Sequence, residues 1–254
     1  MADMVEVWLL RDDLPPGPGL TLADLYAVLD AQERQRADAR LRDGDRSRFV
    51  VAHAAVRFIV GERLGAPARE LSWEYGPHGK PALCGAWTGA EVNLSHSGGQ
   101  CLVAVAESRR IGVDIQRLDP GLDVVAMARR YFTSAESQFV QDAVGADART
   151  ERFAQLWTRK EAVTKAAGGR LIREGMGVSV LGAGGAVATY PEEYRVTDLS
   201  APEGYRAAVA LSGAQDFQVE SRAWDWAVSA GRMSPKRRAT PESSDGTVTG
   251  TPGS

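Results

Sequence analysis

The strongest structural constraint in the chain is a long stretch, Thr150–Ala167, that contains neither proline nor glycine. On a 3.6-residue wheel its apolar residues form one stripe, as expected for a helix packed against a core. Lys160 falls within that stripe, and Glu161 and Lys165 share one face at its edge because they are four residues apart. Two interpretations stay open: a functional site, or a snorkelling lysine beside an ordinary surface ion pair. The stripe consists of Phe153, Leu156, Trp157, Val163 and Ala167.

A second unusual feature is a short acid-bearing strand, expected at Ile111–Gln116. Side chains of a strand alternate between its two faces, so the odd-numbered residues should enter the core. Gly112, Asp114 and Gln116 then share the opposite face. Aspartate is disfavoured within strands, so Asp114 indicates either a functional residue or a residue at the edge of a hairpin.

Basic and polar residues come earlier in the chain. Most arginines between residues 32 and 48 have the pattern of a solvated helix surface. Arg48 is different because it opens an apolar helix, Phe49–Val60, and a guanidinium at a helix entrance can bind phosphate beside free backbone N–H groups. Lys80 lies on a loop rich in glycine and proline, and Ser95 and His96 end a short strand.

These residue types together predict chemistry on a phosphate ester. Aspartate and glutamate oxygens are hard ligands that suit magnesium, which commonly bridges carboxylates and substrate phosphates. Lysine and arginine outside that shell would hold the remaining phosphate charge.

Composition narrows the class of protein. The 254 residues are enough for one large domain or two smaller ones, and the net charge of −3 argues against nucleic-acid binding. Cys84 and Cys101 have no histidines at zinc spacing, so we expect reduced core cysteines. The N-terminus lacks the pattern of a signal peptide, and no apolar stretch is long enough to span a membrane. We therefore expect a cytoplasmic protein without membrane contact.

The other segments predict a mixed α+β chain. One internal similarity, between Cys101–Ser108 and Tyr205–Ser212, suggests a duplicated α+β unit. The tail of residues 234–254 consists mostly of Ser, Thr, Pro and Gly, so we expect it to be disordered. Strands are expected at Val5–Leu10, Tyr205–Leu211 and Phe217–Glu220, and helices at Leu122–Tyr131 and from Thr133 towards Val144.

Four motifs in order resemble those of Sfp-type 4′-phosphopantetheinyl transferases. Gly112–Gln116 (GVDIQ) and, further along, Trp157–Lys165 (WTRKEAVTK) are similar to the paired signature of that family. Upstream, Gly79–Pro81 (GKP) and Asn93–Gly98 (NLSHSG) are similar to two more of its motifs. The resemblance covers roughly residues 34 to 211. It departs from the family at Gln116, where a carboxylate is usual.

The resemblance implies an α+β pseudo-dimer of two similar halves, with antiparallel strands and flanking helices. We expect an N-terminal half at residues 1–108, a C-terminal half at 109–233 and the tail beyond. It also implies a monomer that binds coenzyme A and Mg²⁺ where the halves meet. The implied reaction transfers the 4′-phosphopantetheine arm of coenzyme A to a serine of an apo acyl or peptidyl carrier protein and releases adenosine 3′,5′-bisphosphate.

The resemblance further implies a role for each candidate residue. Asp114 and Glu161 would hold magnesium, with Gln116 as a third candidate ligand, and Glu161 would also deprotonate the attacking serine. Lys165 would contact the pyrophosphate of coenzyme A, and Lys160 is a further candidate for binding it. The adenine-nucleotide end would be held by Arg48, Lys80, Ser95 and His96, with Arg48 and His96 on the 3′-phosphate.

Two alternative functions stay open. The first is a non-catalytic module that binds coenzyme A or a nucleotide. It stays open because Gln116 stands where the family usually has a carboxylate. The second is a serine hydrolase or acyltransferase that uses His96 with Ser95 or Ser97. That alternative is disfavoured because neighbouring strand residues point to opposite faces and no Gly-x-Ser-x-Gly elbow surrounds either serine.

Overall fold

The computed structural model describes residues 3–13, 19–76, 79–169, 177, 179–182 and 194–226. Its α-helices are α1 (Leu22–Val28), α2 (Ala31–Asp38), α3 (Asp43–Leu64), α4 (Val124–Tyr131), α5 (Ser134–Gln141) and α6 (Ala146–Ala167). Two short 3₁₀ helices, Ala68–Glu70 and Gly85–Trp87, lie between α3 and α4 in the chain. The strands are β1 (Asp3–Arg11), β2 (Trp73–Tyr75), β3 (Pro81–Leu83), β4 (Glu91–Ser97), β5 (Gln100–Ala106), β6 (Ile111–Arg117), β7 (Tyr194–Leu199), β8 (Tyr205–Ser212) and β9 (Phe217–Ala223).

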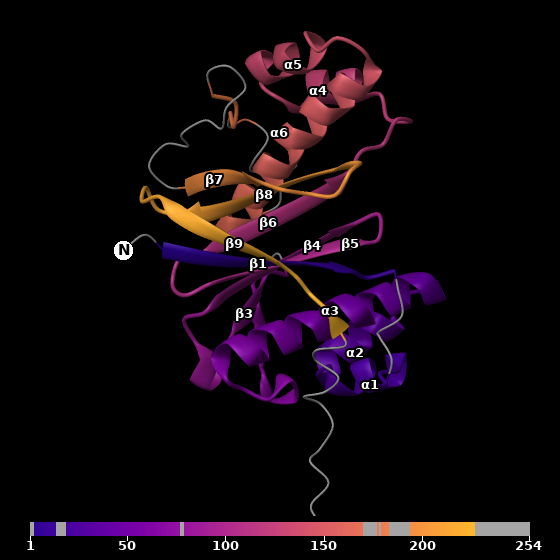
Figure 1. The fold of residues 1–254 in the computed structure, drawn as a ribbon, viewed down its shortest axis with the longest axis vertical. Helices are drawn as coiled ribbons and strands as arrows, with labels where there is room; N and C mark the ends of the chain where they lie inside the picture. The colour runs from indigo at the N-terminus through magenta and orange to yellow at the C-terminus, as the bar shows by residue number, and fades with distance from the viewer. Residues whose placement is uncertain are drawn as a thin grey trace, which may run out of the picture.

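Two sheets lie face to face between two long helices. One sheet has the strand order β4-β5-β1-β9, and the other has the order β6-β8-β7. All neighbours in them are antiparallel except β1 and β9, which are parallel. Figure 1 shows α3 below the first sheet and α6 above the second. The mixed α+β architecture with antiparallel strands and flanking helices is therefore confirmed.

A single apolar layer joins the two sheets. Side chains from β1 and β5 meet side chains from β6 and β8, and all of them are almost fully excluded from solvent. This burial removes apolar surface from water on one face of each sheet, while α3 and α6 cover the opposite faces. The strand β6 is thus buried on both faces, which the alternating pattern predicted for only one. The members of the layer include Val7, Leu102, Ile111, Val113, Ile115 and Val209.

The two parts of the chain have related layouts. Both α3 and α6 are 22 residues long. The strand β5 lies between β4 and β1, as β8 lies between β6 and β7, so the two similar segments occupy equivalent central positions. The strand β9 comes late in the chain but pairs with β1, and Trp224 N–H donates to the Leu9 carbonyl at 2.8 Å. The division between residues 108 and 109 stays a prediction.

The helix α3 begins earlier than its apolar run suggests. It starts at Asp43, and Asp43 and Asp45 in its first turn favour a start there because carboxylates stabilise the positive end of the helix dipole. Arg48 therefore lies inside the helix and not at its entrance. The expectation that Arg48 shares a phosphate with free N–H groups at a helix N-terminus is wrong for this reason.

The helix α6 lies directly on β6, and glycine makes this contact possible. A Cβ atom placed on Gly112 would overlap the carbonyl oxygen of Ala162 and the backbone nitrogen of Ala166. The apolar stripe of α6 is buried as expected at Phe153, Leu156 and Val163, but Ala167 is exposed at the end of the helix. The close approach fixes the height of each α6 side chain above the strand.

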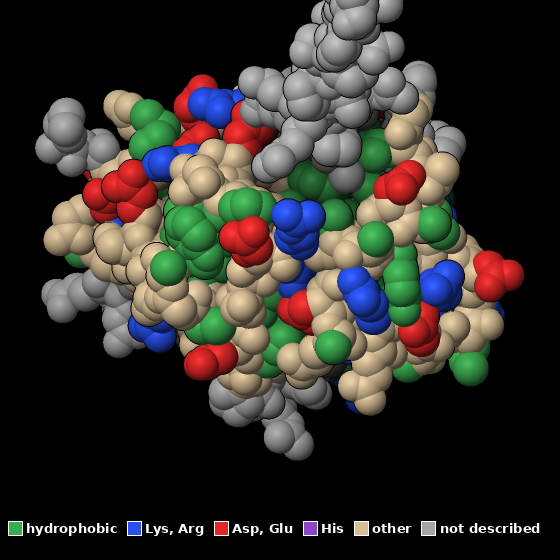
Figure 2. Space-filling view, turned by 90° about the horizontal axis from the view of Figure 1, so that it is seen from below, with side chains coloured by type: hydrophobic (Ala, Val, Ile, Leu, Met, Phe, Trp, Pro, Cys, Tyr) green, Lys and Arg blue, Asp and Glu red, His purple; other side chains and the backbone are tan. Residues whose placement is uncertain are grey.

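Several other expectations have definite outcomes. Cys84 and Cys101 are both free, and Cys101 is buried. None of the helices in the described ranges combines the length and hydrophobicity that crossing a bilayer requires. On the face that Figure 2 shows, basic and acidic side chains are intermixed. The expected disordered tail and much of the glycine-rich region after residue 170 lie outside the described residues.

Candidate active site

The site is built where the edge strands of the two sheets, β4 and β6, run side by side. Three alternating side chains of β4 accept hydrogen bonds from alternating backbone N–H groups of β6. The Oδ1 atom of Asn93 accepts from Val113 at 2.9 Å, and the Oγ atoms of Ser95 and Ser97 accept from Ile115 at 3.4 Å and Arg117 at 3.1 Å. The Asn-Leu-Ser-His-Ser motif therefore joins the sheets through side chains.

Asp114 lies at the centre of this junction. Its Oδ1 atom accepts hydrogen bonds from Ser95 Oγ and Lys165 Nζ, both at 2.7 Å. Lys165 Nζ also donates to Ser95 Oγ at 2.9 Å and to the carbonyl of Val113 at 3.2 Å. Since Asp114 is buried, these charge-assisted bonds are only weakly screened by water. The other oxygen of Asp114, Oδ2, receives no hydrogen bond from the described part of the chain.

Glu161 lies one helical turn before Lys165 and is half-buried. No described residue donates a hydrogen bond to its carboxylate or forms an ion pair with it. Burial raises the pKa of Glu161, and the negative charge of Asp114 raises it further, whereas the charge of Lys165 lowers it. An unpartnered carboxylate beside a second carboxylate is an arrangement that a cation stabilises.

The residues at this point fit a magnesium ion that is completed by other oxygens. The amide nitrogen of Gln116 donates to the carbonyl of Arg117 at 3.0 Å, which leaves its oxygen available. Asp114, Gln116 and Glu161 thus offer hard oxygen donors of the kind that Mg²⁺ prefers. Among the described residues, no three or more His, Cys, Asp or Glu side chains gather closely enough to hold a metal by themselves. Substrate oxygens and water would have to supply the remaining ligands.

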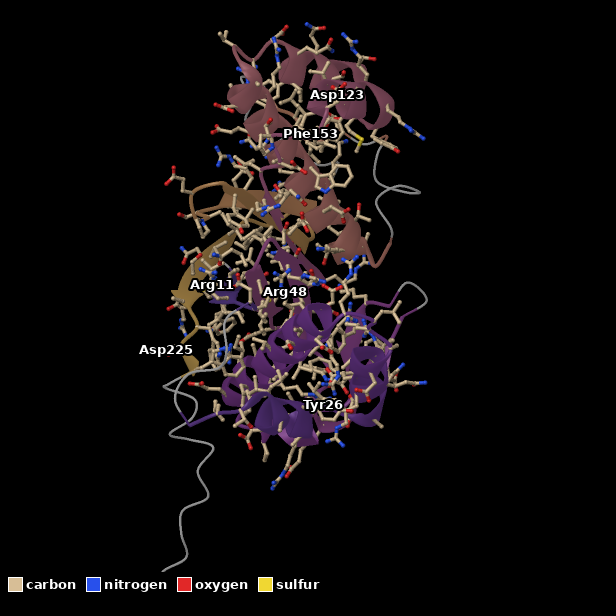
Figure 3. All side chains as sticks on the ribbon, turned by 90° about the vertical axis from the view of Figure 1, so that its right-hand side faces the viewer. Arg11, Tyr26, Arg48, Asp123, Phe153 and Asp225 are labelled. Carbon is tan, nitrogen blue, oxygen red and sulfur yellow. The ribbon has the colours of Figure 1, made fainter. Side chains whose placement is uncertain are left out.

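A cationic cluster adjoins the carboxylates. The imidazole of His96 lies on the opposite face of β4 from Ser95 and is 57% exposed. Burial of part of the ring lowers the pKa of His96, the charge of Asp12 raises it, and the charges of Lys165, Arg40 and Arg48 lower it. Figure 3 places Arg48 at the level where the two parts of the molecule meet, between Tyr26 and Phe153.

Two charged residues around His96, Arg40 and Asp12, were missed by the sequence analysis. Arg40 belongs to the charged run that was interpreted as a solvated surface. Asp12 directly follows β1, and no spacing relates it to His96. Only the chain reversal that pairs β1 with β5, and β5 with β4, brings Asp12 beside His96.

Lys80 lies between the start of β6 and the end of α6. Its ammonium donates to the Ile111 carbonyl and to Glu91 Oε2, both at 3.1 Å, and to the Ala166 carbonyl at 3.5 Å. Burial lowers the pKa of Lys80, and Glu91 opposes this effect. The lysine therefore joins both elements that carry the carboxylates, and its contact with a nucleotide stays a prediction.

Lys160 is the candidate that the structure separates from the others. Its side chain is fully buried and its ammonium forms an ion pair with Glu136 of α5 at 2.9 Å, above the ring of Phe132 at 5.5 Å. The next position on a helix is rotated by about 100°, so Glu161 faces the junction while Lys160 faces α4 and α5. Lys160 therefore does not reach solvent as a snorkelling lysine would, and its buried ion pair does not fit a ligand of coenzyme A. We do not include it in the site.

Comparison with known proteins identifies the family. Residues 110–210 match the model of the 4′-phosphopantetheinyl transferase superfamily. The chain is 30% identical over 229 residues to the 4′-phosphopantetheinyl transferase HetI of Nostoc, a match that covers 89% of this chain and 94% of the relative. It is 37% identical to the 4′-phosphopantetheinyl transferase AcpT of Escherichia coli O157:H7, over 57% of this chain and 74% of the relative. A 4′-phosphopantetheinyl transferase of Bacillus subtilis is 28% identical over 57% of this chain and 62% of its own length.

The chain is therefore an enzyme of the transferase class. It belongs to the 4′-phosphopantetheinyl transferase superfamily. The resemblance carried by the four motifs is confirmed.

Proposed function

We propose that the enzyme transfers the 4′-phosphopantetheine arm of coenzyme A to a serine of an apo acyl or peptidyl carrier protein in a reaction that depends on Mg²⁺. The observation that carries this proposal is the group formed by Asp114, Glu161 and Lys165. It combines two carboxylates, one of them without a hydrogen-bond partner among the described residues, with an ammonium fixed between two elements. Phosphoryl transfer requires mainly positioning and neutralisation of charge, and this group supplies both.

The chain's own residues perform defined steps in this reaction. Glu161 accepts the proton of the carrier serine, directly or through water, and the serine oxygen forms a bond to the β-phosphorus of coenzyme A. The bond from that phosphorus to the bridging oxygen breaks, and adenosine 3′,5′-bisphosphate leaves with the electron pair. Lys165 balances charge on the pyrophosphate, and its bonds to Asp114 and Ser95 hold it in place. A bound magnesium ion would stabilise the negative charge that develops on the phosphate oxygens.

The two ends of coenzyme A have different surroundings in this proposal. Arg48 and His96 hold the 3′-phosphate, with Arg40 nearby and Lys80 at the adenine-nucleotide end. An apolar cavity beside Gln116 is lined by Leu118, Met127, Phe153 and Trp157. We assign it to the apolar part of the pantetheine arm, because Gln116 forms part of its wall and lies two residues after Asp114 on β6.

The serine hydrolase alternative has no support from the site geometry. Within the described ranges, no hydrogen bond joins His96 to Ser95 or Ser97. Ser95 is instead directed at Asp114, and Ser97 at the backbone of β6. A base and a nucleophile in catalysis must lie within hydrogen-bond reach of each other.

Intact-mass analysis of carrier proteins tests the proposed function. Several unrelated apo carriers are incubated with the enzyme, coenzyme A and magnesium, and we expect at least one to gain the mass of a phosphopantetheine arm. A carrier whose serine is replaced by alanine should gain nothing, and a chelator should stop the reaction. Binding of coenzyme A without any mass change on any carrier would contradict catalysis and favour the binding-module alternative. Ester hydrolysis without a carrier would favour the hydrolase.

The uncharged residue at position 116 predicts a specific dependence on magnesium. An amide oxygen can ligate the ion but does not offset its charge, so the site should depend mainly on Asp114, Glu161 and the pyrophosphate. Gln116→Glu should lower the magnesium concentration that gives half-maximal rate, and Gln116→Ala should lose much less activity than Asp114→Ala. Initial rates at a series of magnesium concentrations check this. Equal inactivity of Gln116→Ala and Asp114→Ala would make the glutamine an essential ligand and contradict the prediction.

A further inference from the structure

A buried carboxylate lies behind His96. Asp12 follows the last residue of β1, and its backbone N–H donates to the carbonyl of Gly99 at 3.2 Å. Its side chain is 1% exposed, and Oδ2 lies 3.9 Å from Nδ1 of His96. The other oxygen, Oδ1, is also buried and receives no hydrogen bond from any described residue. A buried carboxylate with so few partners lowers the stability of the fold, so its position here needs an explanation.

More positive than negative charges act on His96. His96 is approached by Lys165 from α6, by Arg40 from the turn after α2 and by Arg48 from α3, and all three charges lower its pKa. The pKa of His96 is lowered overall, mainly by burial, and the charge of Asp12 opposes this effect. Burial raises the pKa of Asp12 itself, the neighbouring Asp13 adds to this, and the charges of His96 and Arg48 oppose it.

The geometry of the ring determines what such a carboxylate does. The two nitrogens of an imidazole are on different edges of the ring, so a partner at Nδ1 leaves Nε2 free. When a carboxylate holds a proton on Nδ1, Nε2 can donate to a phosphate only if the ring carries both protons, because the neutral ring would then offer an acceptor at Nε2. In a cluster of three other cations, the doubly protonated ring needs a nearby negative charge.

We propose that Asp12 is a positioning residue for His96, which holds the proton on Nδ1 and keeps Nε2–H available to donate to a phosphate monoester. Under the proposed function, on which this inference rests, that group is the 3′-phosphate of coenzyme A. Asp12 does not touch the substrate and acts through the orientation and charge of the imidazole. The consequence is selectivity for a substrate that carries the 3′-phosphate over one that lacks it.

Calorimetric titrations with coenzyme A and with 3′-dephospho-coenzyme A test the proposal. Asp12→Asn keeps the size of the side chain and removes its charge. We expect the Kd for coenzyme A to rise about tenfold, which corresponds to the loss of one charge-assisted hydrogen bond, and the Kd for the dephosphorylated compound to stay the same. The effect should largely disappear when His96 is already alanine, because residues that act through one another are not additive.

A matched control lies next in the chain. Asp13 carries the same charge, but Arg11 Nε and Nη2 engage its two oxygens at 2.8 Å each. Asp13→Asn should leave both dissociation constants unchanged. If Asp12→Asn folds poorly, judged by thermal melting, Asp12→Ser provides a second uncharged variant. An equal loss of affinity for both compounds would show that Asp12 supports packing only, and would overturn the proposal.

A second measurement does not depend on the substrate. The chain has three histidines, so imidazole NMR signals can be assigned by single substitutions. We expect the pKa of His96 to fall in Asp12→Asn and to stay unchanged in Asp13→Asn. An unchanged pKa would overturn the proposal even if coenzyme A binds well. Failure of the parent protein to bind coenzyme A would instead contradict the proposed function, while the pKa comparison would still decide whether Asp12 and His96 interact.

Discussion

Glu161→Gln lowers the rate of phosphopantetheine transfer by about 10²-fold or more, which is the usual contribution of a positioned general base. The substitution keeps the shape of the side chain and removes both its negative charge and its ability to accept a proton. The carboxylate has no partner among the described residues, so its replacement breaks no hydrogen bond or ion pair of the described fold. We therefore expect the loss in turnover to come without a loss in thermal stability.

Rates at saturating coenzyme A, together with melting curves, check this expectation. Glu151→Gln is the matched control, because Glu151 lies on the same helix but is exposed and paired with Arg206 at 2.7 Å. That control should transfer at the parent rate. If Glu161→Gln also transfers at the parent rate, the assignment of the base is wrong. If it loses stability along with activity, the effect belongs to the fold.

Gly112→Ala produces the second large effect. The added methyl group would overlap the backbone of α6 at Ala162 and Ala166, and backbone atoms cannot move aside as a flexible side chain can. The helix must shift away from β6 and carry Glu161 and Lys165 with it. A displacement of about 1 Å at a catalytic group can cost about 10²-fold in rate, and overpacking of this kind typically destabilises a fold by about 1–3 kcal/mol.

Transfer rate and unfolding by denaturant should both be measured for this variant. Gly44→Ala is the control, because a Cβ atom at Gly44 would meet no other part of the described chain within 4 Å and Gly44 lies in a helix, where alanine is favoured. It should retain both activity and stability. Parent-like turnover in Gly112→Ala would mean that the height of α6 above β6 does not set the geometry of the site.

The periodicity of the sequence predicted the elements of the site better than their partners. Alternation along β6 placed Asp114 and Gln116 on one face, and the helical wheel placed Glu161 and Lys165 on another single face. The wheel also placed Lys160 correctly within the apolar stripe. Its partner, Glu136, is 24 residues earlier on a different helix, and a periodicity within one helix contains no information about such a contact.

Contacts between the two sheets were the part that sequence patterns could not supply. Ser95 was expected at the nucleotide, and its contact with coenzyme A stays a prediction, but the structure directs its hydroxyl at Asp114. That bond depends on the side-by-side placement of two edge strands that share no backbone ladder. Asp12 was not predicted for a related reason: it lies beside His96 only because β1 pairs with β5 and β5 pairs with β4. The start of α3 was misplaced because acidic residues, and not apolar ones, form its first turn.

The pairing of β9 with β1 has a consequence for how the chain reaches its structure. In that register Asp3 lies opposite Phe217 and Leu9 lies opposite Ala223. The pairing therefore joins residues from nearly opposite ends of the described chain. Contacts between such distant residues are slow to form, because a large loop must be ordered first. During synthesis β1 leaves the ribosome well before β9, so one edge of β1 stays unpaired until β9 has also been made. The first strand of the described chain thus gains its outer neighbour only late, and a cut after residue 108 would leave β1 without β9.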